Sequence, residues 1–164
     1  ANNYVSAVGG ANPSDELIKL AYETATITRE KPTCISPTSS YCSRFASNYQ
    51  LILGNYGLPR HNANQLDDLY EETKSGTVRP ISQYNANTLK NGQIIVQNYG
   101  EHGHASTVMK DPQTNINYIV DLYKLQDEPK TRIRIRPTNA ITDLQRKNYL
   151  VNVVTPSQTQ LAQN

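Results

Sequence analysis

The first half of the chain carries apolar residues at helical spacing in three stretches. Ser14, followed by two acidic residues, is typical of a helix start, and the apolar stripe after it consists of Leu17, Ile18, Leu20, Ala21 and Ala25. A second helix is expected after the N-cap candidates Thr38–Ser40, ending near Gly54 or Gly57. Its apolar face consists of Cys42, Phe45, Ala46, Tyr49, Ile52 and Leu53. A third, short helix is predicted from about Asn62 to Thr73.

After Gly76 the pattern changes to short runs rich in β-branched and aromatic residues and bounded by turn residues. These predicted strands are Gly92–Tyr99, Gly103–Lys110, Ile116–Lys124, Thr131–Arg136 and Tyr149–Thr155. Helices followed by strands are typical of the α+β class. We therefore expect N-terminal helices packed on an antiparallel sheet of about five strands.

The composition is that of one hydrated globular domain, expected to span residues 1–164. The chain is 37% hydrophobic and 18% charged, with a mean hydropathy of -0.64, and is long enough to bury a core. No apolar run approaches the roughly 18 residues that cross a bilayer, so we expect no membrane span. Sixteen basic and 14 acidic residues give a net charge of +2, which is too small to indicate a nucleic-acid partner.

One local charge pattern stands apart from this balance. Arg132, Arg134 and Arg136 alternate with isoleucines. The favoured interpretation is a strand whose Ile face packs inward and whose Arg face is solvated. A surface that attracts an anionic polymer such as cell wall is the alternative.

The strongest candidate for chemistry is Cys42, which falls in the first turn of the second predicted helix. Unpaired N–H groups and the helix dipole stabilise a thiolate there, and the same N–H groups can hold an oxyanion. A buried cysteine of the helix core would show the same apolar position, so both interpretations stay open. The other cysteine, Cys34, is expected to be a free or structural thiol, because a bridge would consume Cys42.

A thiolate enzyme also needs a base, and the chain has three histidines: His61, His102 and His104. His104 is expected at the mouth of a strand, where a side chain projects into a cleft, whereas His102 precedes it in a loop. The pair His102 and His104 has an alternative interpretation as a zinc site, with His61 as a further ligand. No Cys or His cluster supplies the remaining ligands, so no metal is expected.

The third member of the site follows from the register of a hairpin. If the hairpin is symmetric about the Pro112–Gln113 bond, His104 lies opposite Asp121, with Cβ atoms roughly 5 Å apart. An aspartate there would fix the imidazole tautomer. A slip by one residue would place Leu122 opposite His104, and a slip by two would place Tyr123 there. An aspartate solvated on an exposed strand is the alternative.

Four stretches resemble a known family in order and spacing. Tyr41–Phe45 looks like the Cys-Ser-Gly-Phe core of NlpC/p60-type papain-fold peptidoglycan hydrolases. Gly57–Leu66 is similar to the Gly-x-Pro-x-Pro-Arg-Gly-Asn-Ala-Asn stretch of amidase effectors of type VI secretion. Leu89–Val96 resembles the family's entry into its first core strand, and Gly103–Ala105 resembles the Gly-His-Val/Ala of its catalytic histidine. The likeness covers Ser40 to Met109.

The resemblance implies a papain-like fold with Cys42 as nucleophile and His104 as base. It implies cleavage of a peptidoglycan stem peptide between D-glutamate and meso-diaminopimelate, without a cofactor. The protein would be a secreted antibacterial effector that acts in the periplasm of a target bacterium and is neutralised by a cognate immunity protein. The sequence departs from the family pattern at Tyr41, where aspartate is frequent, and at Arg44, where the family has a small glycine.

Within this interpretation, the helix N–H groups around Cys42 hold the oxyanion, with Tyr41 and Ser43 as the neighbouring oxyanion or substrate contacts. Two other functions compete with stem-peptide hydrolysis. A papain-fold toxin that deamidates a protein glutamine would use the same Cys, His and Asp. A non-catalytic wall-binding or structural domain would keep Cys42 as part of its core.

Overall fold

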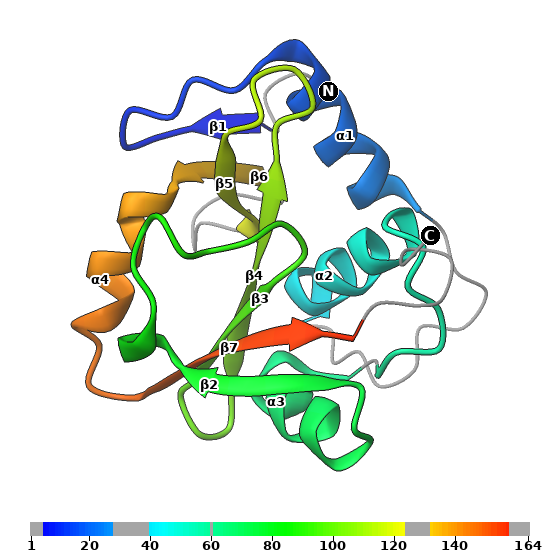
Figure 1. Ribbon diagram of the computed structural model, residues 1–164, viewed down its shortest axis with the longest axis vertical. Coiled ribbons are helices and arrows are strands. Elements are labelled where there is room, and N and C mark those ends of the chain that lie inside the picture. The colour runs from blue at the N-terminus through cyan, green and yellow to red at the C-terminus, as the bar shows by residue number, and fades with distance from the viewer. Residues whose placement is uncertain (1–4, 28–39, 60, 124–131, 158–164) are drawn as a thin grey trace.

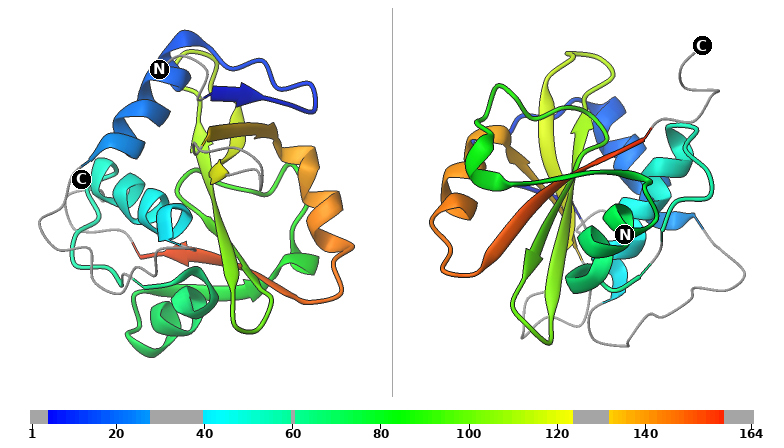
Figure 2. Two further views of the ribbon diagram at one scale, coloured as in Figure 1. Left: turned by 180° about the vertical axis from the view of Figure 1, so that it is seen from behind. Right: turned by 60° about the horizontal axis from the view of Figure 1, so that its bottom comes forward.

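A computed structural model describes residues 5–27, 40–59, 61–123 and 132–157. These residues form an α+β fold around a seven-stranded mixed, mostly antiparallel sheet with the order β1-β6-β5-β4-β3-β7-β2. Three N-terminal helices, α1 to α3, cover one face of the sheet, and the short α4 lies on the other side (Figures 1 and 2). Within the described ranges, no helix is long and apolar enough to span a membrane.

The three helices expected from apolar spacing are confirmed as α1 (Asp15–Thr26), α2 (Ser40–Ile52) and α3 (Ala63–Glu72). Ser14 is the N-cap of α1, and its hydroxyl accepts a hydrogen bond from the Leu17 N–H at 3.2 Å. The sequence analysis missed α4 (Ile141–Gln145), which is too short to show a helical period. Its Ile141 and Leu144 are buried against the sheet.

All five predicted strands are present. They are β3 (Ile94–Asn98), β4 (Gly103–Lys110), β5 (Asn117–Tyr123), β6 (Arg132–Pro137) and β7 (Leu150–Pro156). The expected number of strands and their wholly antiparallel pairing were wrong, because two edge strands were missed. The strand β1 (Val5–Ala7) pairs parallel to β6, and β2 (Gly76–Pro80) pairs antiparallel to β7. Both are short and largely solvent-facing, so neither shows the buried apolar pattern of a central strand.

The hairpin between β4 and β5 has a register two residues away from the predicted one. Thr107 pairs with Val120 and Lys110 with Asn117. The turn closes through a hydrogen bond from the Asp111 N–H to the Ile116 carbonyl at 2.8 Å, with Asn115 in the left-handed region at φ 62°. Because a shift of two residues preserves the strand face, Asp121 remains on the same side of the sheet as predicted.

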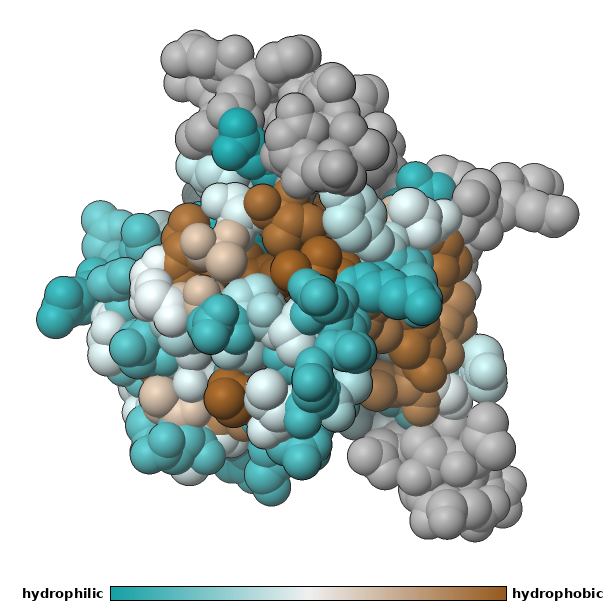
Figure 3. All heavy atoms as spheres, turned by 90° about the horizontal axis from the view of Figure 1, so that it is seen from above, coloured by the Kyte–Doolittle hydropathy of each residue, from teal (hydrophilic) through white to brown (hydrophobic). Residues whose placement is uncertain are grey.

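The core is divided between the two faces of the sheet. Facing α2 and α3 are Ile94, Val96, Ala105 and Val154, and facing α4 are Ile95, Val108, Ile119, Val151 and Val153. This alternation along each strand is the two-residue period of a sheet that is covered on both faces. In the space-filling view from above, apolar residues gather in a central area and along one side, and polar residues cover most of the rest (Figure 3).

Candidate functional site

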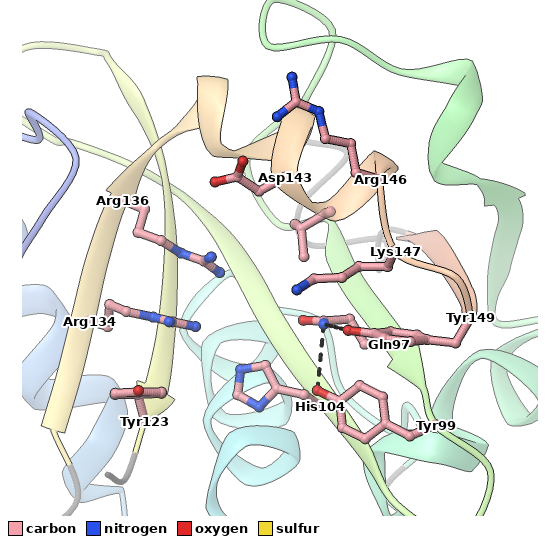
Figure 4. Close-up of a pocket in the computed structure, with 11 residues that line it drawn as sticks. Gln97, Tyr99, His104, Tyr123, Arg134, Arg136, Asp143, Arg146, Lys147 and Tyr149 are labelled. Atoms are coloured by element: carbon pink, nitrogen blue, oxygen red, sulfur yellow. Dashed lines mark hydrogen bonds between the residues drawn. The ribbon is translucent and has the colours of Figure 1, made fainter.

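Three elements bring Cys42, His104 and Asp121 together. Cys42 lies in the first turn of α2, His104 is the second residue of β4, and Asp121 lies on β5. Cys42 packs with Ala105 and Val96 on the helical face of the sheet. The ring of His104 stands at the end of the strand, and α2 passes behind it (Figure 4).

The imidazole of His104 is held by Asp121. The distance between His104 Nε2 and Asp121 Oδ2 is 2.6 Å. Because a carboxylate can only accept a hydrogen bond, Nε2 carries a proton and its N–H donates the hydrogen bond. Because Nε2 is engaged by Asp121, Nδ1 is the ring nitrogen left to bond the Cys42 thiol. The β4–β5 pairing ends at Thr107 and Val120; continued by three residues, the same register would set Tyr123 opposite His104 and Asp121 diagonal to it, within reach of a long side chain.

Asp121 is fully buried and has a second cationic partner, Arg134. The Arg134 guanidinium donates from Nε to Oδ1 at 3.0 Å and from Nη2 to Oδ2 at 2.6 Å. Ser106 donates its hydroxyl to Oδ2 at 3.3 Å. Burial opposes ionisation of the carboxyl, but the hydrogen bonds from His104 and Arg134 outweigh it, so the pKa of Asp121 is lowered.

The Arg face of β6 is therefore not simply solvated, and that expectation was wrong. Arg134 and Arg136 are only 21% and 15% exposed. Arg134 also lies over the Tyr123 ring, with its Cζ 4.4 Å from the ring centre. The two side chains turn inward because Asp121 on the neighbouring strand supplies a buried negative charge.

The Cys42 side chain interacts directly with His104. Burial disfavours the thiolate, but the hydrogen bond and positive charge of His104, with the backbone N–H groups of Ala105 and Ser43, outweigh burial and lower the pKa of Cys42. The Ala105 N–H is available because the β4–β5 ladder ends at Thr107 and Val120. Cys42 itself is only 7% exposed.

The charge of His104 complements the thiolate. Burial disfavours imidazolium, but the hydrogen bonds to Asp121 and Cys42 raise the pKa of His104 to about 9. The lowered pKa of Cys42 and the raised pKa of His104 both favour a thiolate–imidazolium pair, in which positive and negative charges would alternate from Arg134 through Asp121 and His104 to Cys42. Such a pair is what a thiol nucleophile would need for its activation.

We expect Cys42 to be a thiolate at neutral pH, as measured by ultraviolet thiolate absorbance in a Cys34→Ser background. As the pH falls through the lowered pKa of Cys42, the thiolate is protonated and the pair's contribution to stability is lost. As the pH rises through about 9, His104 loses its charge and the contribution is lost again. In His104→Ala the thiolate signal at neutral pH should fall sharply, because only the Ala105 and Ser43 N–H groups then oppose the effect of burial. An identical titration in both proteins would show that the ion pair does not form.

The position of His104 depends on the close approach of the β3–β4 turn to α3. A Cβ on Gly103 would lie 2.6 Å from the Asn64 backbone nitrogen and 2.7 Å from the Gln97 carbonyl oxygen. The Asn64 side chain donates to the Gly100 carbonyl at 3.0 Å. Only glycine fits at position 103, and this contact holds the start of β4 in place.

The other residues singled out from the sequence do not all contribute side chains to this site. Ser43 is buried and donates its hydroxyl to the His61 carbonyl, and its backbone N–H is the group that bonds to the Cys42 sulfur. The side chain of Tyr41 and all of Cys34 lie outside the described residues. His102 is exposed, and His61 Nδ1 accepts a hydrogen bond from the Asn62 N–H at 2.8 Å. The described part of the chain contains no cluster of potential metal ligands.

Sequence reasoning missed a hollow of about 590 Å³ that opens beside His104. It is lined by Gln97, Tyr99, His104, Tyr123, Arg134, Arg136, Asp143, Leu144, Arg146, Lys147 and Tyr149 (Figure 4). The alternation of arginines along β6 was the one visible signal for it. The contributions of β3, α4 and β7 come from distant sequence segments and depend on the sheet order.

Comparisons of this chain with protein-family models, with curated proteins and with solved structures gave no match.

Proposed function

We propose that the protein is a cysteine hydrolase with Cys42 as nucleophile, His104 as base and Asp121 as the residue that orients His104. The observation that carries the proposal is a continuous chain of contacts, which runs from the thiol of Cys42 at the start of α2 through His104 to the buried carboxylate of Asp121. Thiol, imidazole and carboxylate in this order are the parts that acyl transfer needs. The four family-like stretches support a papain-like fold of the NlpC/p60 type.

In the proposed mechanism the Cys42 thiolate attacks the carbonyl carbon of an amide, and the carbonyl π bond becomes an oxyanion. Backbone N–H groups at the start of α2 are the natural donors to that oxyanion. The tetrahedral adduct collapses as His104 gives its proton to the leaving amine, which leaves a thioester on Cys42. Neutral His104 then takes a proton from a water molecule whose oxygen attacks the thioester carbonyl carbon. The C–S bond breaks, the carboxylic acid leaves, and the Cys42 thiolate and the His104 imidazolium are restored.

The substrate proposed from the resemblance is a peptidoglycan stem peptide, cut between D-glutamate and meso-diaminopimelate. The biological role proposed with it is that of an antibacterial effector of type VI secretion, which acts in the periplasm of the target cell. A cognate immunity protein would then occupy the site. These roles rest on the residues of Ser40 to Met109 that look like the family's motifs.

Incubation of purified protein with bacterial sacculi tests this function. The expected result is a changed muropeptide profile, in which stem peptides end in D-glutamate and free diaminopimelate-containing peptides appear. The matched control is Cys42→Ala, which should leave the sacculi intact. Sacculi that remain unchanged with both proteins would remove the peptidoglycan hydrolase proposal.

One observation favours a second candidate, a non-catalytic domain. Cys42 is 7% exposed and packs among apolar side chains, as a core cysteine does. The two candidates differ in thiol chemistry at neutral pH. An activated Cys42 reacts with iodoacetamide faster than a model thiol, and a core Cys42 reacts more slowly.

A further inference from the structure

The hollow beside His104 has a cationic part and an aromatic part. Arg134 and Arg136 from β6 and Lys147 from the end of α4 point toward one another across it, whereas Arg146 points away (Figure 4). On the side nearest β3 and β7 stand Tyr99 and Tyr149, whose rings meet edge to face at 4.7 Å. Gln97 donates to the Tyr149 hydroxyl at 2.7 Å and holds this aromatic side in place.

The cations of the hollow are not fully balanced by the protein. Arg134 is engaged by Asp121, but Nε and Nη2 of Arg136 are buried and have no hydrogen-bond partner among the described residues. The distance from Arg136 Nη2 to Asp121 Oδ2 is 3.6 Å, which is too long for a hydrogen bond. Asp143 is the lining carboxylate, and it is exposed.

A buried guanidinium without an acceptor is costly, and an anion that enters the hollow relieves that cost. Burial lowers the pKa of Arg136, and the neighbouring Arg134 charge lowers it further; the charges of Asp121 and Asp143 oppose this shift without cancelling it. Lys147 reaches the hollow from the opposite side as an exposed cation. The two side chains offer a carboxylate one partner on each side.

We propose that this hollow is a substrate subsite that binds a free carboxylate of a peptide, through Arg136 and Lys147, beside the amide to be cut. The inference rests on the proposed function, because it places the carboxylate next to the base His104. A γ-glutamyl amide bond leaves the α-carboxylate of the glutamate free, and the three carbons Cα, Cβ and Cγ separate that carboxylate from the scissile carbonyl. The hollow therefore selects acidic γ-glutamyl peptides over those in which this carboxylate is amidated.

Binding to Cys42→Ala, measured by calorimetry, tests the subsite without requiring turnover. The probes are N-acetyl-L-alanyl-γ-D-glutamyl-meso-diaminopimelate and the same peptide with the glutamyl α-carboxylate amidated. The free carboxylate should bind about 10-fold more tightly or better, as expected for hydrogen bonds to a charged group. Lys147→Gln and Arg136→Gln in this background should each remove most of that preference. Arg79→Gln on β2 makes the same change of charge at an exposed position outside the hollow and should keep it.

Equal affinity for the two peptides, or an equal loss in Arg79→Gln and Lys147→Gln, would overturn the subsite. Absence of binding by either peptide would overturn it as well. Hydrolysis by the protein with Cys42 intact is measured in parallel with both peptides. Cleavage of both at the same rate would sink the subsite while leaving the hydrolase proposal standing. Carboxylate-selective binding without any cleavage would sink the hydrolase proposal while leaving an acidic-peptide site.

Discussion

Replacing Cys42 or His104 by alanine is expected to lower the hydrolysis of a soluble stem peptide by at least about 10³-fold. The two side chains act as one unit, because His104 lowers the pKa of Cys42 and Cys42 in turn raises the pKa of His104. The double variant should therefore be no slower than the slower single variant. Initial rates of release of the diaminopimelate amine measure the effect.

The matched control for this prediction is His102→Ala. His102 lies two residues before His104, is exposed, and is not among the residues that line the hollow. Its removal should leave the rate within about 2-fold of the unchanged protein, as expected for a surface substitution away from the site. Full activity in His104→Ala, or equal losses in His104→Ala and His102→Ala, would show that His104 is not the base.

The second large effect is expected from Asp121→Asn. Asparagine keeps the shape but removes the buried negative charge that Arg134, Arg136 and protonated His104 share. Breaking a buried ion pair by removing one partner costs about 3–5 kcal/mol, and the partial exposure of the two guanidinium groups moves the expected loss to about 2–3 kcal/mol. Denaturant unfolding at neutral pH measures this change in the free energy of unfolding.

The sign of the pH dependence follows from the lowered pKa of Asp121. Its stabilisation is complete above the pKa that the carboxyl has in the unfolded chain, and it is lost as the pH falls through the folded pKa. The stability difference between Asp121→Asn and the unchanged protein should therefore shrink in acid. Asp68→Asn, an exposed carboxylate on α3, is the control and should cost within about 0.5 kcal/mol.

Activity and stability separate in the double variant Asp121→Asn with Arg134→Gln. Removing the cation together with the anion leaves fewer uncompensated buried charges, so part of the lost stability should return. Hydrolysis should not recover, because His104 still lacks the carboxylate that orients its ring. Recovery of both properties together would mean that Asp121 has only a structural role.

Local sequence signals were enough to predict the three N-terminal helices and the central strands. Apolar spacing after Ser14 and after Thr38–Ser40 predicted the positions of α1 and α2, and β-branched runs predicted the five inner strands. The edge strands β1 and β2 and the five-residue α4 were missed, since short, half-exposed elements carry little periodic signal. Their positions depend on the partner against which each one packs.

The candidate site likewise has features that the sequence predicted and one feature that it did not. The position of Cys42 in a helix's first turn and of His104 at a strand's start could be predicted from local pattern. The hairpin register could not be predicted, because the same residues fit two turns. One is centred on the Pro112–Gln113 bond, and the other is the observed turn, which closes between Asp111 and Ile116. Asp121 still reaches His104 because the error of two residues equals one strand period.

By itself, the sequence determined which residues form elements and which face of each element is apolar, since both follow from interactions between residues a few positions apart. The tertiary structure alone decided that Arg134 would share Asp121 with His104, and that β3, α4 and β7 would enclose a cationic hollow. Those contacts join segments far apart in the chain, and they are fixed by the order and twist of the strands. The contacts of Asp121 also depend on charge, because a buried carboxylate needs a cationic partner, and Arg134 on the neighbouring strand β6 supplies it.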